Sequence, residues 1–347
     1  MLPNNIKLTD NPGPFLSLYL QKWSFSKVMV LTDENTLTHC YPLLKSLLPD
    51  HSVITISSGE ENKTLKTCEE IWKQMTNLEL DRHSILIVLG GGVLGDMGGF
   101  CAATYKRGID FILIPTTLLA MADASIGGKL GIDFHHFKNH IGVFKEPKLT
   151  VIYSEFLKTL PTEELRSGFA EVIKHALISD RTLWNELRSN TLDNQPWDVL
   201  LRHSAEFKSS VVQQDPTEQG MRKILNAGHT IGHALESFFL KAGNKILHGE
   251  AVAAGLVAEA WLSKKRGILS ETELNEISEF ILKVFGKLNI GSENLHAIAG
   301  LCSQDKKNKG KRILCVLSEG IGKARWDCEV TENEIVDALA YYRSLQM

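Results

Sequence analysis

Histidines at helix-compatible spacing, with a carboxylate close by, are the residues of this sequence best suited to hold a metal ion. His229 and His233 are four residues apart, so on a helix they project from one face, and His248 and Glu250 open a later segment. Imidazoles with a carboxylate can bind a divalent cation and leave a coordination position open. Thr230 follows His229, so the pattern differs from the His-Glu-x-x-His of zinc proteases. A structural role for each histidine is the alternative, since a chain with 12 histidines shows this spacing by chance.

A glycine-rich segment follows an apolar, β-branched run over residues 85–89. Gly90, Gly92 and Gly95 fit Gly-x-Gly-x-x-Gly, with a strand expected before them and a helix after them. Such glycines let the backbone approach a pyrophosphate, whose charge is met by N–H groups at the helix N-terminus. Dinucleotide folds usually carry this pattern after their first strand, whereas two expected strands precede it here. We therefore expect a phosphate cradle in a variant topology; a glycine-rich turn without a ligand is the alternative.

Basic side chains beside glycines or acidic residues form a second candidate set. Lys129 follows a glycine pair, Lys138 precedes an amide side chain, and Lys174 lies three residues after Glu171 on one expected helix face. A lysine beside paired glycines can approach an anion closely. A solvated lysine or a surface ion pair is the alternative for each of them. Further cations are Lys208, Arg222 and the basic run 305–312.

Composition narrows the class of protein. The chain has 347 residues, 43% hydrophobic and 23% charged, which excludes a disordered or membrane-rich protein. Its 38 basic and 41 acidic residues leave a net charge of −3, so we expect a small anionic partner and no nucleic acid. Six cysteines without a Cys-x-x-Cys pair predict reduced thiols. Neither a signal-peptide pattern nor a membrane-spanning apolar run is present, so we expect a cytoplasmic protein without a membrane partner.

The elements that must position these residues differ between the two halves of the chain. Short β-branched runs predict parallel strands in the first half, with helices between them. The strands are expected at 27–31, 52–56, 85–89, 111–114 and 150–153, and the helices at 37–48 and 67–78. Long helical segments follow at 164–178, 199–213, 229–240, 250–265 and 271–288, with a strand at 312–317 and a helix at 332–345. The sequence thus predicts an α/β domain at 1–160 and a mostly helical domain at 161–347.

Taken in order, several segments between residues 58 and 322 resemble the 3-dehydroquinate synthase family of the sugar-phosphate cyclase superfamily. These segments are SGEENKT, GGGVLGDMGGFCAATYKRG, IPTTLLAMADASIGGKLGID, KNHIGVF, LPTEELRSGFAEVIKHALI, RKILNAGHTIGHALE, LHGEAVAAGL and DKKNKG. The resemblance implies an N-terminal Rossmann-like parallel-sheet domain that binds NAD+ and a C-terminal, mostly helical domain that binds metal and substrate. It places the active site in the cleft of the fold.

The resemblance also implies which residues form the site. Glu171, His229 and His248 would bind Zn2+ or Co2+, and His233 would contact substrate or transfer a proton instead of binding metal. The positions that match NAD+ contacts are Asn35, Ser58, Gly59, Glu60, Glu61, Asn62, Lys63, Gly92, Val93, Leu94, Gly95, Asp96, Thr116, Thr117, Lys129, Lys138, Phe156, Leu157, Lys158 and Thr159. Those that match substrate contacts are Arg107, Asp123, Lys129, Lys138, Asn139, Lys174, Lys208, Arg222, Asn226, His233 and one lysine of the pair 306–307, assigned to Lys307. Arg107 is expected to reach across the interface of a homodimer.

The chemistry of this family explains the need for such residues. Its substrate is 3-deoxy-D-arabino-heptulosonate 7-phosphate, a sugar acid phosphate whose two anionic ends require cations. The metal acidifies the C5 hydroxyl so that hydride can leave to NAD+, and the new ketone acidifies the C6 proton for β-elimination of phosphate. Return of the hydride, ring opening and an intramolecular aldol step then give 3-dehydroquinate. We therefore expect a carbon–oxygen lyase without net redox change.

Two related activities are the alternatives. Other sugar-phosphate cyclases share the NAD+ and metal segments. A substrate that bears a carboxylate is favoured by the Lys138–Asn139 pair, Arg222 and His233, and valiolone-type cyclases tend to lack this second histidine. A metal-dependent polyol dehydrogenase of the glycerol dehydrogenase type needs no such set of cations.

Overall fold

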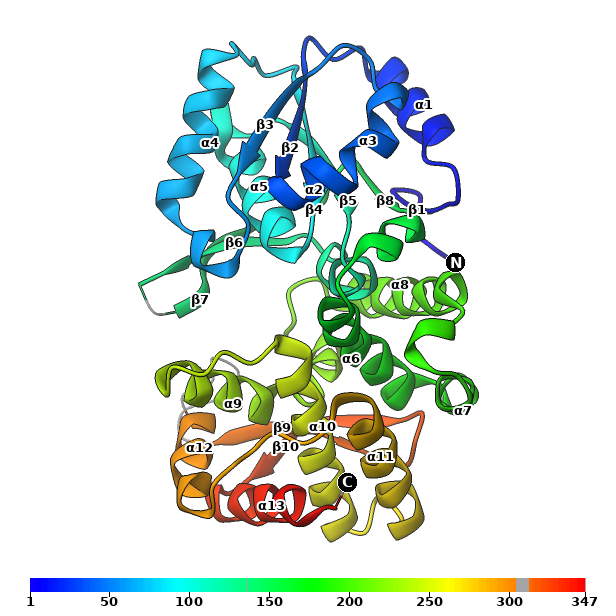
Figure 1. Cartoon of the computed structure of the whole chain (residues 1–347), viewed down its shortest axis with the longest axis vertical. Coiled ribbons are helices and arrows are strands. Elements are labelled where there is room, and N and C mark those ends of the chain that lie inside the picture. The colour runs from blue at the N-terminus through cyan, green and yellow to red at the C-terminus, as the bar shows by residue number, and fades with distance from the viewer. Residues whose placement is uncertain (136, 304–311, 347) are drawn as a thin grey trace. The chain divides into compact units, whose positions relative to one another are not determined.

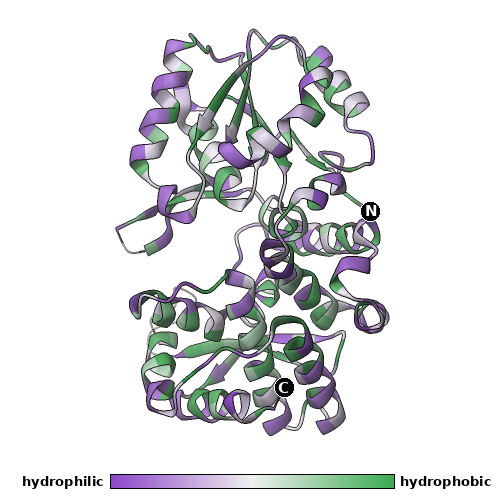
Figure 2. Cartoon of the chain, in the orientation of Figure 1, coloured by the Kyte–Doolittle hydropathy of each residue, from purple (hydrophilic) through white to green (hydrophobic). Residues whose placement is uncertain are grey.

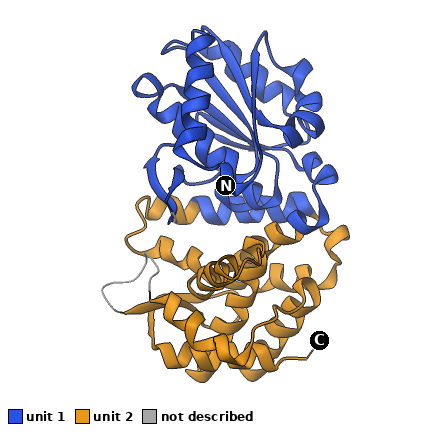
Figure 3. Ribbon diagram, turned by 60° about the vertical axis from the view of Figure 1, so that its left-hand side comes forward, with its two compact units in different colours: residues 1–165, 197–209 blue, residues 166–196, 210–347 orange. Residues whose placement is uncertain are grey.

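The computed structural model describes residues 1–135, 137–303 and 312–346, and it forms two compact units (Figures 1 and 3). The first unit comprises residues 1–165 and 197–209, and the second comprises residues 166–196 and 210–347. Helix α8 (Trp197–Gln214) therefore contributes residues to both units. The assignment of NAD+ binding to 1–160 and of metal and substrate binding to 161–347 stays a prediction.

A six-stranded parallel sheet forms the centre of the first unit, in the order β1-β8-β5-β4-β2-β3. Its strands are β1 (Ile6–Leu8), β2 (Val28–Asp33), β3 (Ser52–Ile56), β4 (Ile85–Gly90), β5 (Asp110–Pro115) and β8 (Leu149–Ile152). The five predicted strands are confirmed, whereas β1 is too short to show periodicity. Every residue of β4 and β8 is buried, and Figure 2 shows these central strands as hydrophobic. Continuous burial is typical of a parallel sheet with both faces covered.

The helices of the first unit differ from prediction at a proline. Besides the start of α8, they are α1 (Gly13–Trp23), α2 (Glu34–His39), α3 (Tyr41–Leu44), α4 (Leu65–Asn77) and α5 (Gly92–Thr104). The prediction of one helix over 37–48 is wrong, because Pro42 lies in the first turn of α3 and has no N–H to continue α2. Helix α2 starts earlier than expected, since Asp33 caps it by accepting the N–H of Thr36 at 2.7 Å.

An antiparallel hairpin of β6 (Lys129–Phe134) and β7 (Phe137–Phe144) lies between β5 and β8 in the chain. Leu130 and Ile132 of β6 are buried and join the core cluster that includes Met97 and Cys101 of α5. Strand β7 is exposed along nearly its whole length. It therefore lacks the half-buried alternation by which an antiparallel strand is found in a sequence.

The second unit is mostly helical. Its helices are α6 (Thr162–Ser179), α7 (Arg181–Ser189), the end of α8, α9 (His229–Lys241), α10 (His248–Lys265), α11 (Glu271–Phe285), α12 (Leu295–Cys302) and α13 (Glu332–Ser344). An antiparallel pair, β9 (Ile313–Ser318) and β10 (Ala324–Val330), completes it. The predicted helices and the strand at 312–317 are confirmed; α7, α12 and β10 are additional. Over the described ranges, no helix is long and apolar enough to cross a membrane.

Gly98 allows α5 to pack directly on the sheet. A Cβ at this position would lie 2.8 Å from Leu31 Cδ2 and 2.9 Å from Val88 Cγ2. We predict that Gly98→Val lowers the free energy of unfolding by about 1–3 kcal/mol, because overpacking displaces its neighbours. Gly95→Ala is the control, since its Cβ would meet nothing within 4 Å. Thermal unfolding followed by circular dichroism compares the two variants, and equal melting temperatures would contradict the prediction.

Candidate active site

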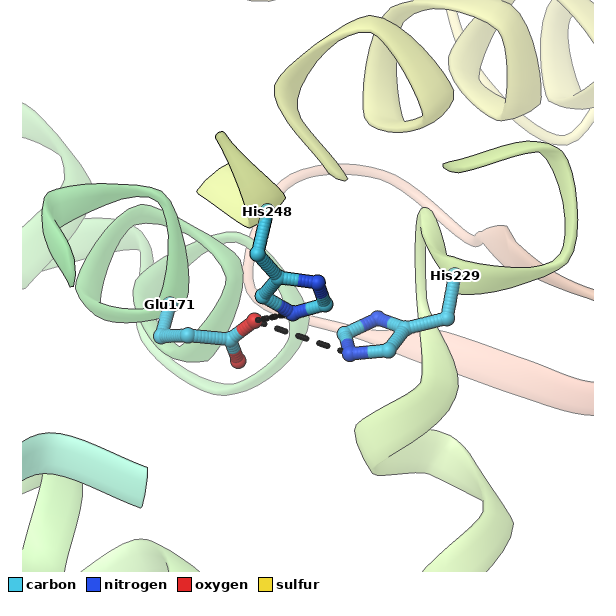
Figure 4. Close-up of side chains that lie close together, drawn as sticks. All are labelled: Glu171, His229 and His248. Atoms are coloured by element: carbon cyan, nitrogen blue, oxygen red, sulfur yellow. Dashed lines mark ion pairs between the residues drawn. The ribbon is translucent and has the colours of Figure 1, made fainter. Parts of the chain in front are cut away.

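Three side chains from three helices converge within the second unit (Figure 4). Glu171 lies in the middle of α6, whereas His229 and His248 are the first residues of α9 and α10. Glu171 Oε1 is 3.6 Å from His229 Nε2 and 3.5 Å from His248 Nε2. The three potential ligand atoms all lie within 4.8 Å of one another. Two imidazoles and a carboxylate at this spacing suit a divalent metal that keeps a position open.

Hydrogen bonds behind the two imidazoles set their orientation. Nδ1 of His229 lies 3.0 Å from the carbonyl oxygen of Ala227, and Nδ1 of His248 lies 3.3 Å from Glu236 Oε2. Both partners can only accept, so in each ring Nδ1 carries the hydrogen and donates it. When the ring is neutral, the lone pair is then on Nε2, which faces Glu171. The residues therefore fit a metal, because the donor set and its supporting bonds agree.

The carboxylate of Glu171 is also paired with a lysine of the same helix. Glu171 and Lys174, which is one turn later in α6, are both 1% exposed, and Lys174 Nζ makes an ion pair with Glu171 Oε2. The spacing of three residues thus gives a buried ion pair instead of a surface pair. Lys174 thus places a positive charge on Oε2 of the carboxylate, and the other oxygen, Oε1, faces the two imidazoles.

The histidine pair at i, i+4 does not supply both imidazoles of this cluster. The ring centroid of His233 lies 5.4 Å from that of His229 and 6.3 Å from that of His248, so His233 stands beside the cluster. Glu250 caps the start of α10 and pairs with an arginine of α6. Spacing alone missed Glu171. The signal that marks it is the charged pair of Glu171 and Lys174 among the apolar residues 169–170, 172–173 and 176–178 of one helix, where buried charges are rare.

A close contact between α6 and α10 brings His248 to Glu171. A Cβ on Gly249 would lie 2.0 Å from the carbonyl oxygen of Ser167, so only glycine allows this approach. The N–H of Gly249 also donates to Ser167 Oγ at 3.0 Å. Ser167 precedes Glu171 by about one helical turn. The first residue of α10 is therefore held next to the carboxylate.

In the first unit, the glycine-rich segment forms the turn between β4 and α5, as its pattern predicts. The sheet extends in opposite directions from β2 and β4, and parallel-sheet proteins bind dinucleotides at the carboxyl edge of such a switch point. No side chain caps α5, so the N–H groups of its first turn face this edge. A pocket there is lined by Gly90, Gly92, Gly95, Asp96 and Lys129 among others. The geometry suits a bound pyrophosphate.

Lys63 joins this turn to the β6–β7 hairpin. It is 3% exposed, and its ammonium donates to Asp96 Oδ2 at 2.7 Å and to Asn139 Oδ1 at 2.5 Å. Burial lowers the pKa of Lys63, but the negative charges of Asp96 and Glu60 raise it by more, so the pKa lies above its usual value. Lys63 therefore stays positively charged beside the glycine-rich turn.

Other residues expected to bind NAD+ lie at the same carboxyl edge. Asn35 follows β2 and donates to Ser58 Oγ, which follows β3, at 3.2 Å. Thr116 follows β5, and its N–H donates to the carbonyl of Gly90 at 3.0 Å. The 3-10 helix η5 (Ser154–Thr159), with Phe156 to Thr159, follows β8. Their common position results from the parallel sheet, which puts all strand ends of one kind at one edge.

Residues expected to bind substrate occur in both units. In the first unit, Lys208 Nζ lies 2.7 Å from Asp123 Oδ2. In the second, Arg222 is 2% exposed and donates to a loop carbonyl, and Asn226 Nδ2 donates to Glu218 Oε1 at 2.7 Å. All of these cations and amides have protein partners that hold them in place.

For two residues expected to contact substrate, the structure shows no position near the other expected site residues of their unit. Arg107 is exposed, has φ 70, and follows α5 at the amino edge of the sheet, opposite the glycine-rich turn. Lys307 lies outside the described residues, as does Lys306.

Two family models match consecutive segments of the chain. Residues 53–167 match 3-dehydroquinate synthase N-terminal, and residues 168–308 match 3-dehydroquinate synthase C-terminal. The 3-dehydroquinate synthase of Parabacteroides distasonis is 38% identical over 330 residues, which cover 94% of this chain and 94% of that one. The chain belongs to the 3-dehydroquinate synthase family. It is therefore an enzyme of this family.

Solved structures agree with this dehydroquinate synthase fold. The 2-epi-5-epi-valiolone synthase of Streptomyces hygroscopicus subsp. jinggangensis, with NAD+ and Zn2+ bound, has a TM-score of 0.83 and 25% identity and covers 99% of this chain and 97% of its own. A 2-deoxy-scyllo-inosose synthase complexed with carbaglucose-6-phosphate, NAD+ and Co2+ has a TM-score of 0.83 at 23% identity, covering 97% and 96%. The predicted fold class, α/β plus α, is confirmed.

Metal binding at the cluster of Glu171, His229 and His248 in this chain should depend on pH. Burial lowers the pKa of His248, but hydrogen bonds to Glu171 and Glu236 raise it to about 10. The metal-free imidazole is then protonated below that pH, and a cation must displace the proton. We predict that Co2+ affinity rises by up to about tenfold per pH unit between pH 6.5 and 8.5, because less proton competes.

Calorimetry in buffers of different ionisation enthalpy measures both the affinity and the protons released. Glu236→Gln is the matched variant, since it removes one of the charges that raise the pKa of His248 and should flatten the pH dependence. An affinity that is independent of pH in the unmodified protein would show that His248 is not protonated before the metal binds.

Proposed function

We propose that the protein is a 3-dehydroquinate synthase that converts 3-deoxy-D-arabino-heptulosonate 7-phosphate into 3-dehydroquinate and phosphate. The observation that carries this proposal is the cluster of Glu171, His229 and His248, with the buried Lys174 on its carboxylate. It provides a metal site with an adjacent cation, as a polar anionic substrate requires. The family relatives named above support the same reaction.

The cofactors of the proposal are NAD+ and one divalent metal, Zn2+ or Co2+. The relatives with solved structures contain NAD+ with Zn2+ or Co2+, and the residues of this chain fit both groups. The β4–α5 turn with Lys63 would hold the nucleotide phosphates, and Glu171, His229 and His248 would hold the metal. When bound, the metal supplies Lewis acidity to a substrate hydroxyl, and NAD+ supplies a hydride acceptor.

The chain's own residues bind and orient the substrate in this proposal. Lys174 and Arg222 are buried cations that can neutralise an anionic group without the cost of ordering a flexible side chain. Asn226 is fixed by Glu218 and offers an oriented amide. In this proposal His233, whose ring lies beside the imidazoles of His229 and His248, holds or moves a proton at a substrate oxygen.

The overall reaction needs no external reductant. The hydride that leaves the substrate returns to it within one turnover. Substrate and product therefore differ only by the proton and the phosphate that are lost in the β-elimination. The enzyme is thus a carbon–oxygen lyase in this proposal.

We also propose a cytoplasmic homodimer. Within its own unit, Arg107 lies at the sheet edge opposite the glycine-rich turn, so a second copy is the simplest way for it to contact a substrate bound at a carboxyl edge.

The activity is tested with purified protein, the heptulosonate phosphate, Co2+ and NAD+ in less than stoichiometric amount. We predict that phosphate and dehydroquinate form in equal amounts while NADH does not accumulate. A sugar phosphate without the carboxylate is the matched control substrate and should react poorly. Absence of phosphate release would refute the proposal, and stoichiometric NADH with glycerol would favour a polyol dehydrogenase.

The metal assignment is tested with Glu171→Ala. We predict that this variant loses bound metal and that kcat/KM falls by more than about 100-fold, since even outer-shell partners of a metal are worth about 10–100-fold. NAD+ affinity should stay nearly unchanged, because the glycine-rich turn belongs to the first unit. Glu163→Ala, an exposed position in the same helix, is the control. Metal content equal to that of the control would mean that Glu171 is not a ligand.

A further inference from the structure

Glu259 is a buried carboxylate in an otherwise apolar stretch of α10. Only 2% of it is exposed, and the preceding residues 251–258 are buried and uncharged. A buried carboxylate costs stability unless it is hydrogen-bonded or paired with an opposite charge, and glutamate is for that reason rarely fully buried. The burial of Glu259 therefore indicates a role that an apolar side chain could not perform.

One contact of Glu259 leads directly to a proposed metal ligand. Its Oε2 accepts the N–H of Gly228 at 2.7 Å. That N–H belongs to the same planar peptide group as the carbonyl of Ala227, which accepts Nδ1–H of His229 at 3.0 Å. A single rigid peptide thus connects the carboxylate to the imidazole. Hydrogen bonds in such a chain polarise one another, so the negative charge strengthens the bond to His229.

Close packing keeps this peptide against α10. Gly228 has φ 76, and a Cβ there would lie 2.7 Å from the carbonyl oxygen of Val252. A Cβ on Gly255 would lie 2.0 Å from the carbonyl oxygen of Gly228. Gly255 and Glu259 are four residues apart and share a helix face. The face of α10 that the turn contacts is therefore the face that carries Glu259.

We propose that Glu259 is a positioning residue for His229. Through the 227–228 peptide it holds the imidazole in the tautomer with hydrogen on Nδ1, leaves the lone pair on Nε2 toward Glu171, and makes that nitrogen a stronger ligand. Glu236 has the same relation to His248, but by a direct hydrogen bond. The effect on metal affinity rests on the proposed function, whereas the effect on the tautomer does not.

The test compares three variants. Glu259→Met keeps the length of the side chain and removes the acceptor, and Glu259→Gln keeps an acceptor oxygen without the charge. Glu276→Met is the matched control, because Glu276 is a largely buried acid of α11 that binds Trp184 and Arg188 away from the cluster. The readouts are nitrogen chemical shifts of histidine-labelled, metal-free protein, with His229 assigned by substitution, and the affinity and visible spectrum of Co2+.

We expect Glu259→Met to give His229 a mixture of tautomers, to weaken Co2+ binding by about 10–100-fold and to change the Co2+ spectrum. The His229 tautomer and the Co2+ affinity of Glu259→Gln should be closer to those of the unmodified protein. Those of Glu276→Met should equal the unmodified values even if the melting temperature of this variant falls. An unchanged tautomer and an unchanged Co2+ affinity in Glu259→Met would overturn the proposal.

The two proposals fail in different ways. If His229 changes tautomer in Glu259→Met but the unmodified protein does not bind Co2+ at the cluster, the positioning role stands and the proposed metal function fails. If Glu259→Met does not fold, Glu259→Asp replaces it: its carboxylate is one methylene too short for Gly228 and should give the same changes, and their absence overturns the positioning role.

Discussion

The negative charge of Glu171 is the constraint around which the second unit is organised. A carboxylate at 1% exposure is costly unless opposite charge and hydrogen bonds surround it. Lys174 meets one oxygen, and Nε2 of His229 and His248 faces the other. Without a metal, the raised pKa of His248 favours a protonated imidazole between Glu171 and Glu236. In the proposed metal site, a divalent cation would supply this positive charge in place of the proton.

Helix starts and glycines give this arrangement its geometry. Both imidazoles are on the first residues of their helices, and glycines allow α6, α9 and α10 to approach at backbone distance. The nucleotide side of the proposal uses a related device, because glycines at the β4–α5 turn expose N–H groups at the start of α5. In each unit, glycines lack the Cβ that would block a close approach, and this lets backbone or side-chain groups of the proposed site come together.

The sequence predicts the sheet well because both faces of its strands are buried, which gives continuous apolar runs such as 85–89. The glycine pattern could also be placed, since a strand precedes it and a helix follows it. The metal cluster could not be derived from spacing, because spacing relates residues of one helix, whereas Glu171, His229 and His248 come from three. Only the family resemblance joined them. Residues that act through others, such as Glu236 and Glu259, carry no local pattern, and an exposed strand such as β7 shows no alternation.

The central claim is that one metal ion is bound by Glu171, His229 and His248 with a position left open. Anomalous diffraction at the metal absorption edge, from crystals of protein loaded with Zn2+, tests it most directly. The account predicts one strong peak at about 2.0–2.2 Å from Nε2 of both histidines and from a carboxylate oxygen of Glu171, with a remaining site open to solvent or substrate. A peak on other residues, or no peak at this cluster in metal-loaded crystals, would contradict it.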